Sequence, residues 1–273
     1  MNMSVDPGSP LLRAYSLARR SGILRTSWGR RIFKSAYFLY KRYIEDDLRD
    51  LIKSFPDLVG EGDVLDVGAN IGYTACVLAQ TAKAGRKVYA FEPEPFNFRL
   101  LKQTSEQREF DGRIVPLQLA VGAEDGTIDL WINLGHHADH RVMTPQFQAA
   151  HAEEATVHTP LVSVDSFLDG MQSKVSFVKI DVQGYELAVC QGMQNTLRQN
   201  PDITVFLEFM PSAMRDLGFE PSDLIEFFVQ RGFSIYQVHS RGRLTPGMPA
   251  VAEDSNYFDL LFSHRPLACS CTI

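Results

Sequence analysis

The chain has 273 residues, of which 45% are apolar and 22% charged, so it can bury a sizeable core without disulfides or metals. Its net charge of −6 argues against a general nucleic-acid-binding protein, which needs surplus Lys and Arg to neutralise phosphates, and favours a small-molecule partner. No run approaches the roughly 20 apolar residues of a membrane span, and four cysteines are too few for a disulfide framework. We therefore expect a cytoplasmic protein.

The N-terminal segment differs from the rest of the chain in its charge. Residues 7–44 contain nine Lys or Arg and no acid, with apolar residues interleaved at helical spacing. We expect residues 1–60 to form a basic amphipathic helical cap ahead of a main domain over residues 61–273. A cap packed on that domain is the preferred interpretation. A docking face for an acidic partner or a membrane surface, and an organellar transit peptide, are the alternatives.

After residue 62, strand and helix patterns alternate, which is typical of parallel strands joined by crossover helices. The sequence predicts seven strands, over residues 64–67, 88–91, 114–121, 177–181, 203–209, 233–238 and 257–262. It predicts helices over residues 73–82, around residues 98–101, and over residues 186–197 and 222–230. The expected fold class is therefore α/β, with a doubly wound, Rossmann-like sheet.

The rhythm changes between residues 127 and 164, where two strand-like runs flank a polar loop. We expect an inserted β-hairpin whose loop can cover a site. The loop contains four residues able to bind a proton or a metal, which are His136, His137, Asp139 and His140. A general base with His140 as the candidate, a metal site and an ordinary surface loop all fit this cluster. No metal is firmly implied.

The strongest local pattern is Asp66-Val-Gly68-Ala-Asn70-Ile-Gly72, at the turn from the first strand into the first helix. Glycine there lets backbone approach a ligand, and the helix N-terminus offers N–H donors. A dinucleotide site would need G-x-G-x-x-G for its pyrophosphate, and Asp66 would repel phosphate. Asp66 suits an ammonium group instead. The pattern therefore favours S-adenosylmethionine over a nicotinamide cofactor.

Three acids follow predicted strands and are candidate site residues. Glu92 follows the second strand, where an acid can accept hydrogen bonds from two ribose hydroxyls. Asp181 and Glu208 lie at the ends of the next two parallel strands after the insertion, on the edge where open α/β sheets bind ligands. Asp181 is the candidate general base or orienting group, with Glu208 assisting. Each of the two could instead cap a helix or pair with Lys179 or Arg215.

Five segments, in this order, resemble the FkbM family of S-adenosylmethionine-dependent methyltransferases. They are VLDVGANIG at 64–72, FEPEPFN at 91–97, LAVG at 119–122, VDSF at 164–167 and VKIDVQGYE at 178–186. The resemblance covers residues 62–238. It implies a class I methyltransferase sheet, mostly parallel with the last strand antiparallel. It also implies O-methylation of a hydroxyl on a small-molecule acceptor such as a sugar or natural product.

The resemblance also implies roles for individual residues. Asp66, Gly68, Asn70 and Gly72 would surround the methionine part of S-adenosylmethionine, and Glu92 would hold its ribose. Ala120 and Val121 would lie against its adenine. The family usually has Glu where this chain has Gln183, which removes support for a charged or metal-binding role there. A cofactor-binding protein without activity and a nicotinamide-dependent oxidoreductase are the alternative functions.

Overall fold

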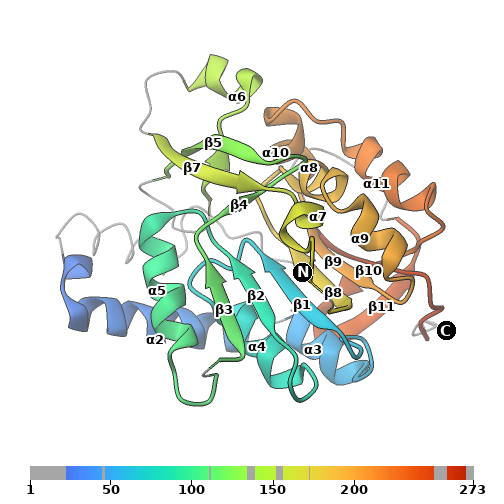
Figure 1. Ribbon diagram of the computed structural model, residues 1–273, viewed down its shortest axis with the longest axis horizontal. Helices are drawn as coiled ribbons and strands as arrows, with labels where there is room; N and C mark the ends of the chain where they lie inside the picture. The colour runs from blue at the N-terminus through green and yellow to red at the C-terminus, as the bar shows by residue number, and fades with distance from the viewer. Residues whose placement is uncertain are drawn as a thin grey trace.

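The computed structural model describes residues 23–44, 47–110, 112–133, 139–151, 156–171, 173–248 and 257–268. Within them a large sheet is flanked by helices on both faces, and a smaller sheet lies across one end of it (Figure 1). The larger sheet has the strand order β11-β10-β12-β9-β8-β1-β2-β3. In that order the strands span Arg243–Pro246, Ser234–His239, Phe258–Ser263, Thr204–Phe209, Val175–Ile180, Asp63–Val67, Val88–Phe91 and Ile114–Leu117.

Strand direction confirms the expected α/β class. β9, β8, β1, β2 and β3 are parallel, and β12 lies antiparallel between β9 and β10. The sequence predicted seven strands for this sheet, whereas the described residues form eight. The additional strand is β11, which pairs antiparallel with β10 at the edge of the sheet. Its sequence, RLTP, is short and ends in proline, so it carries no clear strand pattern.

The smaller sheet contains the predicted insertion. Its order is β4-β7-β5-β6, with bounds Ala120–Val121, Thr156–Val162, Gly126–Trp131 and Arg141–Val142. β5 and β7 are antiparallel, as expected for a hairpin, but they belong to a four-stranded sheet. The single strand predicted over residues 114–121 is wrong, because the chain leaves the larger sheet after β3 and pairs with β7 through β4.

The helices occupy the expected connections, with some differences. They are α2 (Ser27–Ile44), α3 (Asp47–Ser54), α4 (Tyr73–Thr81), α5 (Pro95–Ser105), α6 (Pro145–Ala150), α7 (Val164–Phe167), α8 (Glu186–Gln191), α9 (Gln194–Gln199), α10 (Pro211–Asp216) and α11 (Pro221–Val229). Short 3₁₀ turns span Ile23–Arg25 and Ser240–Gly242. The predicted helix over residues 186–197 is divided at Gly192, where a Cβ would collide with the Gly122 carbonyl oxygen. The chain bends there so that these backbones can approach.

Alternating strand residues form the cores on the two faces. In β1, Val64 packs with α3 and α4, whereas its neighbour Leu65 packs on the other face with α8, α9 and α11. Successive side chains in a strand point to opposite faces, so each central strand contributes to both cores. This explains why every residue of β1 and β8 is buried. The sheet is doubly wound, as predicted.

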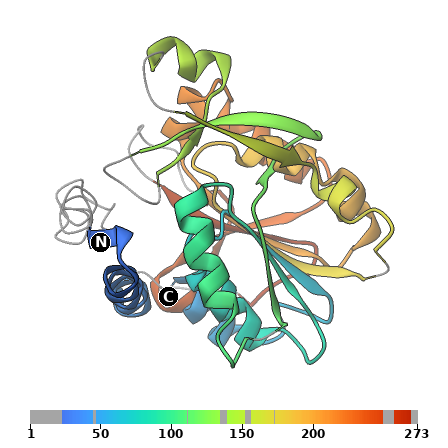
Figure 2. The same cartoon turned by 60° about the vertical axis from the view of Figure 1, so that its left-hand side comes forward.

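Helix α2 lies along the outside of the larger domain, at the edge of the molecule in the second view (Figure 2). Phe33 and Tyr37 pack against Ile71 and Leu100 and so attach the helix beside the turn after β1. The predicted amphipathic helix is confirmed for Ser27–Ile44. Residues 1–22 of the predicted cap lie outside the described part. No helix among the described residues is long and apolar enough to cross a membrane.

Candidate active site

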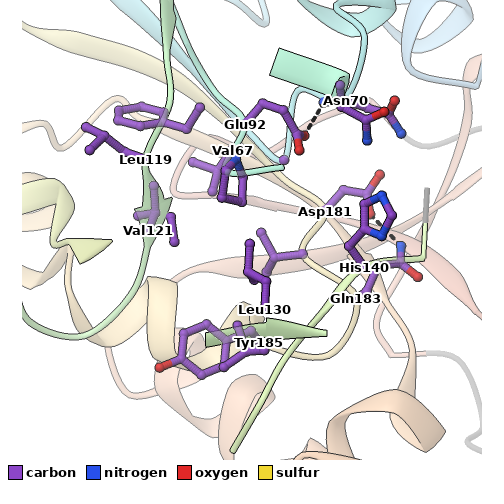
Figure 3. A pocket seen from close by; sticks show the side chains of 17 residues that line it. Val67, Asn70, Glu92, Leu119, Val121, Leu130, His140, Asp181, Gln183 and Tyr185 are labelled. Carbon is purple, nitrogen blue, oxygen red and sulfur yellow. Dashed lines mark hydrogen bonds between the residues drawn. The ribbon is translucent and has the colours of Figure 1, made fainter. Parts of the chain in front are cut away.

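A pocket lies at the carboxyl edge of the larger sheet, between it and the smaller sheet (Figure 3). It has about 640 Å³ of open space, including its mouth. The loops after β1, β2 and β8 line one side, and β4, β5 and β6 contribute the other. The lining residues include Val67, Gly68, Asn70, Phe91, Glu92, Leu119, Ala120, Val121, Leu130, His140, Val142, Asp181, Gln183 and Tyr185.

Glu92 organises the polar end of this pocket. Its Oε2 accepts a hydrogen bond from the Asn70 backbone N–H at 2.8 Å, and its Oε1 accepts one from the Glu94 N–H at 2.9 Å. The side chain is buried, and burial raises its pKa to about 8 despite these two bonds. Asn70 has a left-handed φ of 51°, so the turn after β1 is held in an uncommon conformation against Glu92.

A buried ion pair lies directly behind the pocket. Lys179 Nζ lies 3.3 Å from Asp66 Oδ1 and 3.6 Å from Asp181 Oδ2, and it donates a hydrogen bond to the Gly68 carbonyl at 2.8 Å. Asp66 is fully buried, and burial raises its pKa while Lys179 opposes that rise. Burial alone would lower the pKa of Lys179, but the two carboxylates outweigh it and the pKa is raised. Lys179 therefore stays charged.

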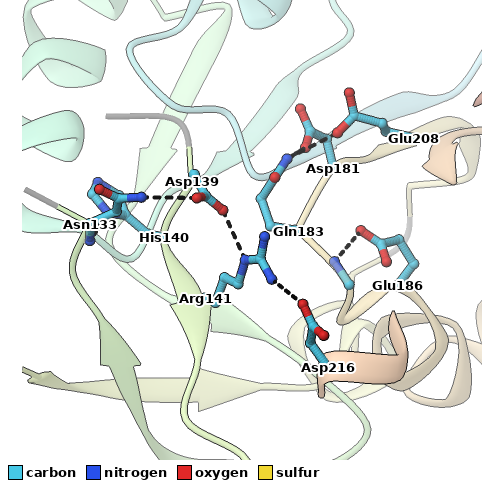
Figure 4. A network of polar contacts seen from close by, with 10 residues as sticks. Asn133, Asp139, His140, Arg141, Asp181, Gln183, Glu186, Glu208 and Asp216 are labelled. Atoms are coloured by element: carbon cyan, nitrogen blue, oxygen red, sulfur yellow. Dashed lines mark hydrogen bonds and ion pairs between the residues drawn. The ribbon is translucent and has the colours of Figure 1, made fainter. Parts of the chain in front are cut away.

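Gln183 joins Asp181 to Glu208. Its Nε2 donates to Asp181 Oδ1 at 2.8 Å and to Glu208 Oε2 at 2.9 Å (Figure 4). Burial disfavours ionisation of Asp181, but Lys179 and the Gln183 amide stabilise its charge, so its pKa is lowered. Burial and the nearby Asp181 raise the pKa of Glu208 well above its ordinary value. Asp181 is thus the ionised member of this pair at neutral pH.

The loop between β8 and α8 is held by Glu186. Its Oε1 accepts hydrogen bonds from the Val182 N–H at 3.2 Å and the Gly184 N–H at 3.1 Å. Gln183, between these two residues, has a left-handed φ of 54°. The carboxyl is buried, which raises its pKa to about 7. Glu186 therefore fixes the loop that presents Asp181 and Gln183 to the pocket.

Arg141 attaches the predicted loop of the insertion to helix α10. Its Nε donates to Asp139 Oδ1 and its Nη1 to Asp216 Oδ2 on α10, both at 2.9 Å (Figure 4). Asp139 also accepts from Asn133 Nδ2 at 2.9 Å. His140 Nδ1 accepts the Asn133 backbone N–H at 3.2 Å. A neutral His140 ring consequently has its proton on Nε2.

The structure brings most of the predicted site residues to one pocket. Gly68, Asn70, Glu92, Ala120, Val121, His140 and Asp181 all line it. Asp66 and Glu208 do not line it: Asp66 pairs with the buried Lys179, and Glu208 accepts a hydrogen bond from the pocket-lining Gln183. Gly72 does not line it either. This glycine, with φ of 92°, lies against the side chains of Leu101 and Thr104, so a Cβ there would crowd α5.

Sequence reasoning gave no role in the site to Glu186 or Arg141, and it named Lys179 only as an alternative partner of Asp181 or Glu208. Lys179 and Glu186 belong to the VKIDVQGYE segment, but only their burial shows that they neutralise Asp66 and hold the loop. Arg141 attaches the smaller sheet to α10 across 75 residues of sequence. The only sequence signal for Lys179 is that it is a charged residue within an apolar strand. Neither the Lys179–Asp66 pair nor the Arg141–Asp216 pair could be inferred without the arrangement of the strands and helices in space.

A metal site finds no support among the residues that the structure describes. No group of three or more His, Cys, Asp or Glu is placed there to hold a metal ion. His136 and His137 lie outside the described residues, so the proposed histidine cluster is seen only through His140. Trp131 and Phe147 pack on each other within the smaller sheet, with ring centroids 5.6 Å apart, and do not line the pocket.

We expect Glu186→Gln to stabilise the protein above neutral pH. The folded-state pKa of Glu186 is about 7, above its ordinary value of 4.5, so the folded wild type retains a proton that the unfolded chain has released. Rising pH therefore favours unfolding until it passes the folded pKa. The variant should have equal stability near pH 5 and be more stable by roughly 2 to 3 kcal/mol at pH 8.

Denaturant unfolding of both proteins at several pH values measures this difference. Other carboxyls with raised pKa values, such as Glu92 and Asp259, are common to both proteins and cancel in the comparison. Glu220→Gln, at an exposed position, is the control and should not change the pH dependence. A difference between wild type and Glu186→Gln that does not vary with pH would contradict the assigned role.

The chain is similar to methyltransferases of known family. A profile of the methyltransferase FkbM domain matches residues 66–235, which contain all of the residues that line the pocket. The hexuronic acid methyltransferase AglP of Haloferax volcanii is 33% identical over 158 residues, 56% of this chain and 60% of that protein. The chain thus matches less than two thirds of this relative's length.

Solved structures with a similar arrangement include two methyltransferases. Methyltransferase FkbM from Methylobacillus flagellatus KT has a TM-score of 0.47 and 15% identity, covering 74% of this chain and 43% of that chain. An S-adenosylmethionine-dependent O-methyltransferase from Thermotoga maritima has a TM-score of 0.40 and 12% identity, covering 82% of this chain and 68% of that chain.

Proposed function

Because the chain belongs to the FkbM methyltransferase family, we propose that it transfers a methyl group from S-adenosylmethionine to a hydroxyl oxygen of a small-molecule acceptor. One observation carries the proposal: a single pocket is lined by Glu92, by the apolar residues of β4 and by the ionised Asp181. A donor and an acceptor can therefore meet within it. Since AglP is a hexuronic acid methyltransferase, a sugar acid is the first acceptor to test.

The residues present fit S-adenosylmethionine. Glu92 would accept hydrogen bonds from the two ribose hydroxyls, each oxygen having a lone pair beyond its backbone bond. Ala120 and Val121 form an apolar wall suited to adenine. Asn70 Oδ1 is buried without a hydrogen-bond partner among the described residues, and Asn70 lines the pocket, so a ligand's ammonium group would satisfy it.

For Asp66 we propose a supporting role, rather than the direct contact with the methionine part of S-adenosylmethionine that the resemblance implies. It is fully buried and paired with Lys179, so it would act on the methionine part only through the turn that it supports. Lys179 donates to the Gly68 carbonyl in the same turn. A Cβ at Gly68 would collide with the Asp181 carbonyl oxygen, so glycine is needed there for β1 and β8 to end side by side.

The acceptor would bind beside Asp181. When bound, S-adenosylmethionine would supply an electrophilic methyl carbon to the acceptor oxygen, and its sulfur would keep the electron pair of the broken sulfur–carbon bond. Asp181 would take the hydroxyl proton of the acceptor. His140 suits a donor role instead, because its Nδ1 accepts the Asn133 N–H and its Nε2 has the proton. Asp181 is accordingly the preferred base.

We expect calorimetry to show binding of S-adenosylmethionine and S-adenosylhomocysteine, and a loss of affinity on the order of 10²-fold in Glu92→Gln. The amide offers one acceptor oxygen for two backbone donors and two ribose hydroxyls, so several of these bonds are lost. Glu61→Gln is the matched control, since the Glu61 side chain is exposed and does not line the pocket. NAD should not bind.

The pH dependence of binding provides a second readout of the same interaction. Because the pKa of Glu92 is about 8, the ligand-free protein must release its proton before the carboxylate can accept two hydroxyl donors. The affinity for S-adenosylmethionine should therefore rise by up to about tenfold for each pH unit below pH 8, and it should stay constant above pH 8. Glu92→Gln should remove this dependence. Folded protein that binds neither adenosyl compound would overturn the proposed function.

A further inference from the structure

Helix α2 has an exposed apolar stripe. Trp28, Ile32 and Leu39 are 54%, 60% and 57% exposed and lie four and seven residues apart, on one side of the helix. Phe33 and Tyr37, on the opposite side, are buried against the domain. Single apolar residues scattered over a surface are ordinary, but a row of three large apolar side chains exposed to water is energetically unfavourable. The stripe therefore indicates a contact with another surface.

The charge of the same helix identifies that surface. α2 contains five cations and no acid, namely Arg30, Arg31, Lys34, Lys41 and Arg42. Arg31 and Arg42 are exposed and lie three residues from Trp28 and Leu39, beside the stripe. The whole chain has a net charge of −6, so this helix is a basic region in an acidic protein. Two copies of such a helix would repel each other.

We propose that α2 lies in the interface of an anionic lipid bilayer, with Trp28, Ile32 and Leu39 inserted at the headgroup boundary. An amphipathic helix with cations beside its apolar side binds in this way, and tryptophan is favoured at that depth. Arg31 and Arg42 contact the lipid phosphates. The helix would lie flat, since its apolar stripe runs along one side while Phe33 and Tyr37 on the other side pack on the protein.

This docking would also orient the pocket. Lys41 follows Tyr37 by four residues, so it lies on the packed side of α2, and its charge acts on Asp181, Glu208 and Asp259. The packed side of α2 is therefore near the acceptor side of the pocket, and the bilayer would lie against the other side of the helix. An acceptor held at a membrane surface would be within reach. Membrane docking itself does not depend on the proposed methyl transfer.

The test is co-flotation of the full-length protein with vesicles of phosphatidylcholine and phosphatidylglycerol, with phosphatidylcholine vesicles alone as the comparison. We expect binding to the anionic vesicles that weakens with added salt. A variant in which Trp28, Ile32 and Leu39 are all replaced by Ser should bind the anionic vesicles about tenfold more weakly, or weaker still. A variant with both Arg31→Glu and Arg42→Glu should lose affinity by a similar factor. In a Trp131→Phe background, Trp28 fluorescence should shift to the blue on binding.

Val229→Ser is the matched control, because Val229 is 54% exposed on α11 and belongs to no basic helix. It should bind vesicles as the wild type does. Failure to bind anionic vesicles, or equal binding by the triple Ser variant, would overturn the proposal. So would self-association without lipid that the triple variant abolishes, since a second copy would then cover the stripe. Calorimetry with S-adenosylmethionine, done without lipid, reports separately on the proposed function.

Discussion

Lys179→Met should lower the free energy of unfolding by about 3 to 5 kcal/mol. The substitution removes the only counter-ion that contacts Asp66 among the described residues, and Asp66 has no exposed surface. It also removes the donor to the Gly68 carbonyl, which accepts from Lys179 at 2.8 Å. Met fills a similar volume, so the loss reports on charge and hydrogen bonding. Denaturant unfolding, with the midpoint and slope both measured, checks the expected value.

A double-mutant cycle separates the ion pair from simple packing. Asp66→Asn combined with Lys179→Met removes both charges, so the double variant should be more stable than Lys179→Met alone. Lys174→Met, on an exposed residue just before β8, is the control and should change stability by less than about 0.5 kcal/mol. Equal destabilisation by Lys179→Met and Lys174→Met would show that the buried pair has no special importance.

Asp181→Asn should lower kcat by about 10² to 10⁴-fold while S-adenosylmethionine affinity stays within about threefold. The amide keeps the size of the carboxyl and can accept a hydrogen bond from the acceptor hydroxyl, but it cannot take the proton. Asp181 lines the pocket and is ionised beside Lys179, which is why the loss is expected there. Single-turnover methyl transfer and calorimetry measure the two quantities independently.

Glu208→Gln is the matched control for Asp181→Asn. Glu208 does not line the pocket, and its raised pKa keeps it protonated, so Gln resembles the form already present. The variant should retain kcat within about threefold, because Gln183 can still bridge to position 208. If Glu208→Gln loses as much activity as Asp181→Asn, Glu208 rather than Asp181 is the base. If neither changes kcat, the proton leaves by another route.

Much of the fold could be predicted because its signals are local. The apolar run at β1, the glycines after it and Glu92 after β2 lie close together in sequence, and the alternation of strands and helices indicates parallel pairing. The position of Asp181 followed from its place at the end of a predicted parallel strand, whereas the direction of the last strand came from the family resemblance. β11 and the division of the strand over residues 114–121 did not follow, because short edge strands depend on their partners.

The sequence by itself determined the doubly wound fold class and the candidate residues at the carboxyl edge of its sheet, since glycines and acids follow predicted strands at set spacings. Only the tertiary structure decided that Asp181 lines the pocket, whereas Asp66 is buried against Lys179 and Glu208 contacts Gln183. Burial and strand neighbours set the pKa and the partners of a carboxyl, and both depend on contacts distant in sequence. For that reason Asp181 faces the pocket, whereas Asp66 and Glu208 support it from behind.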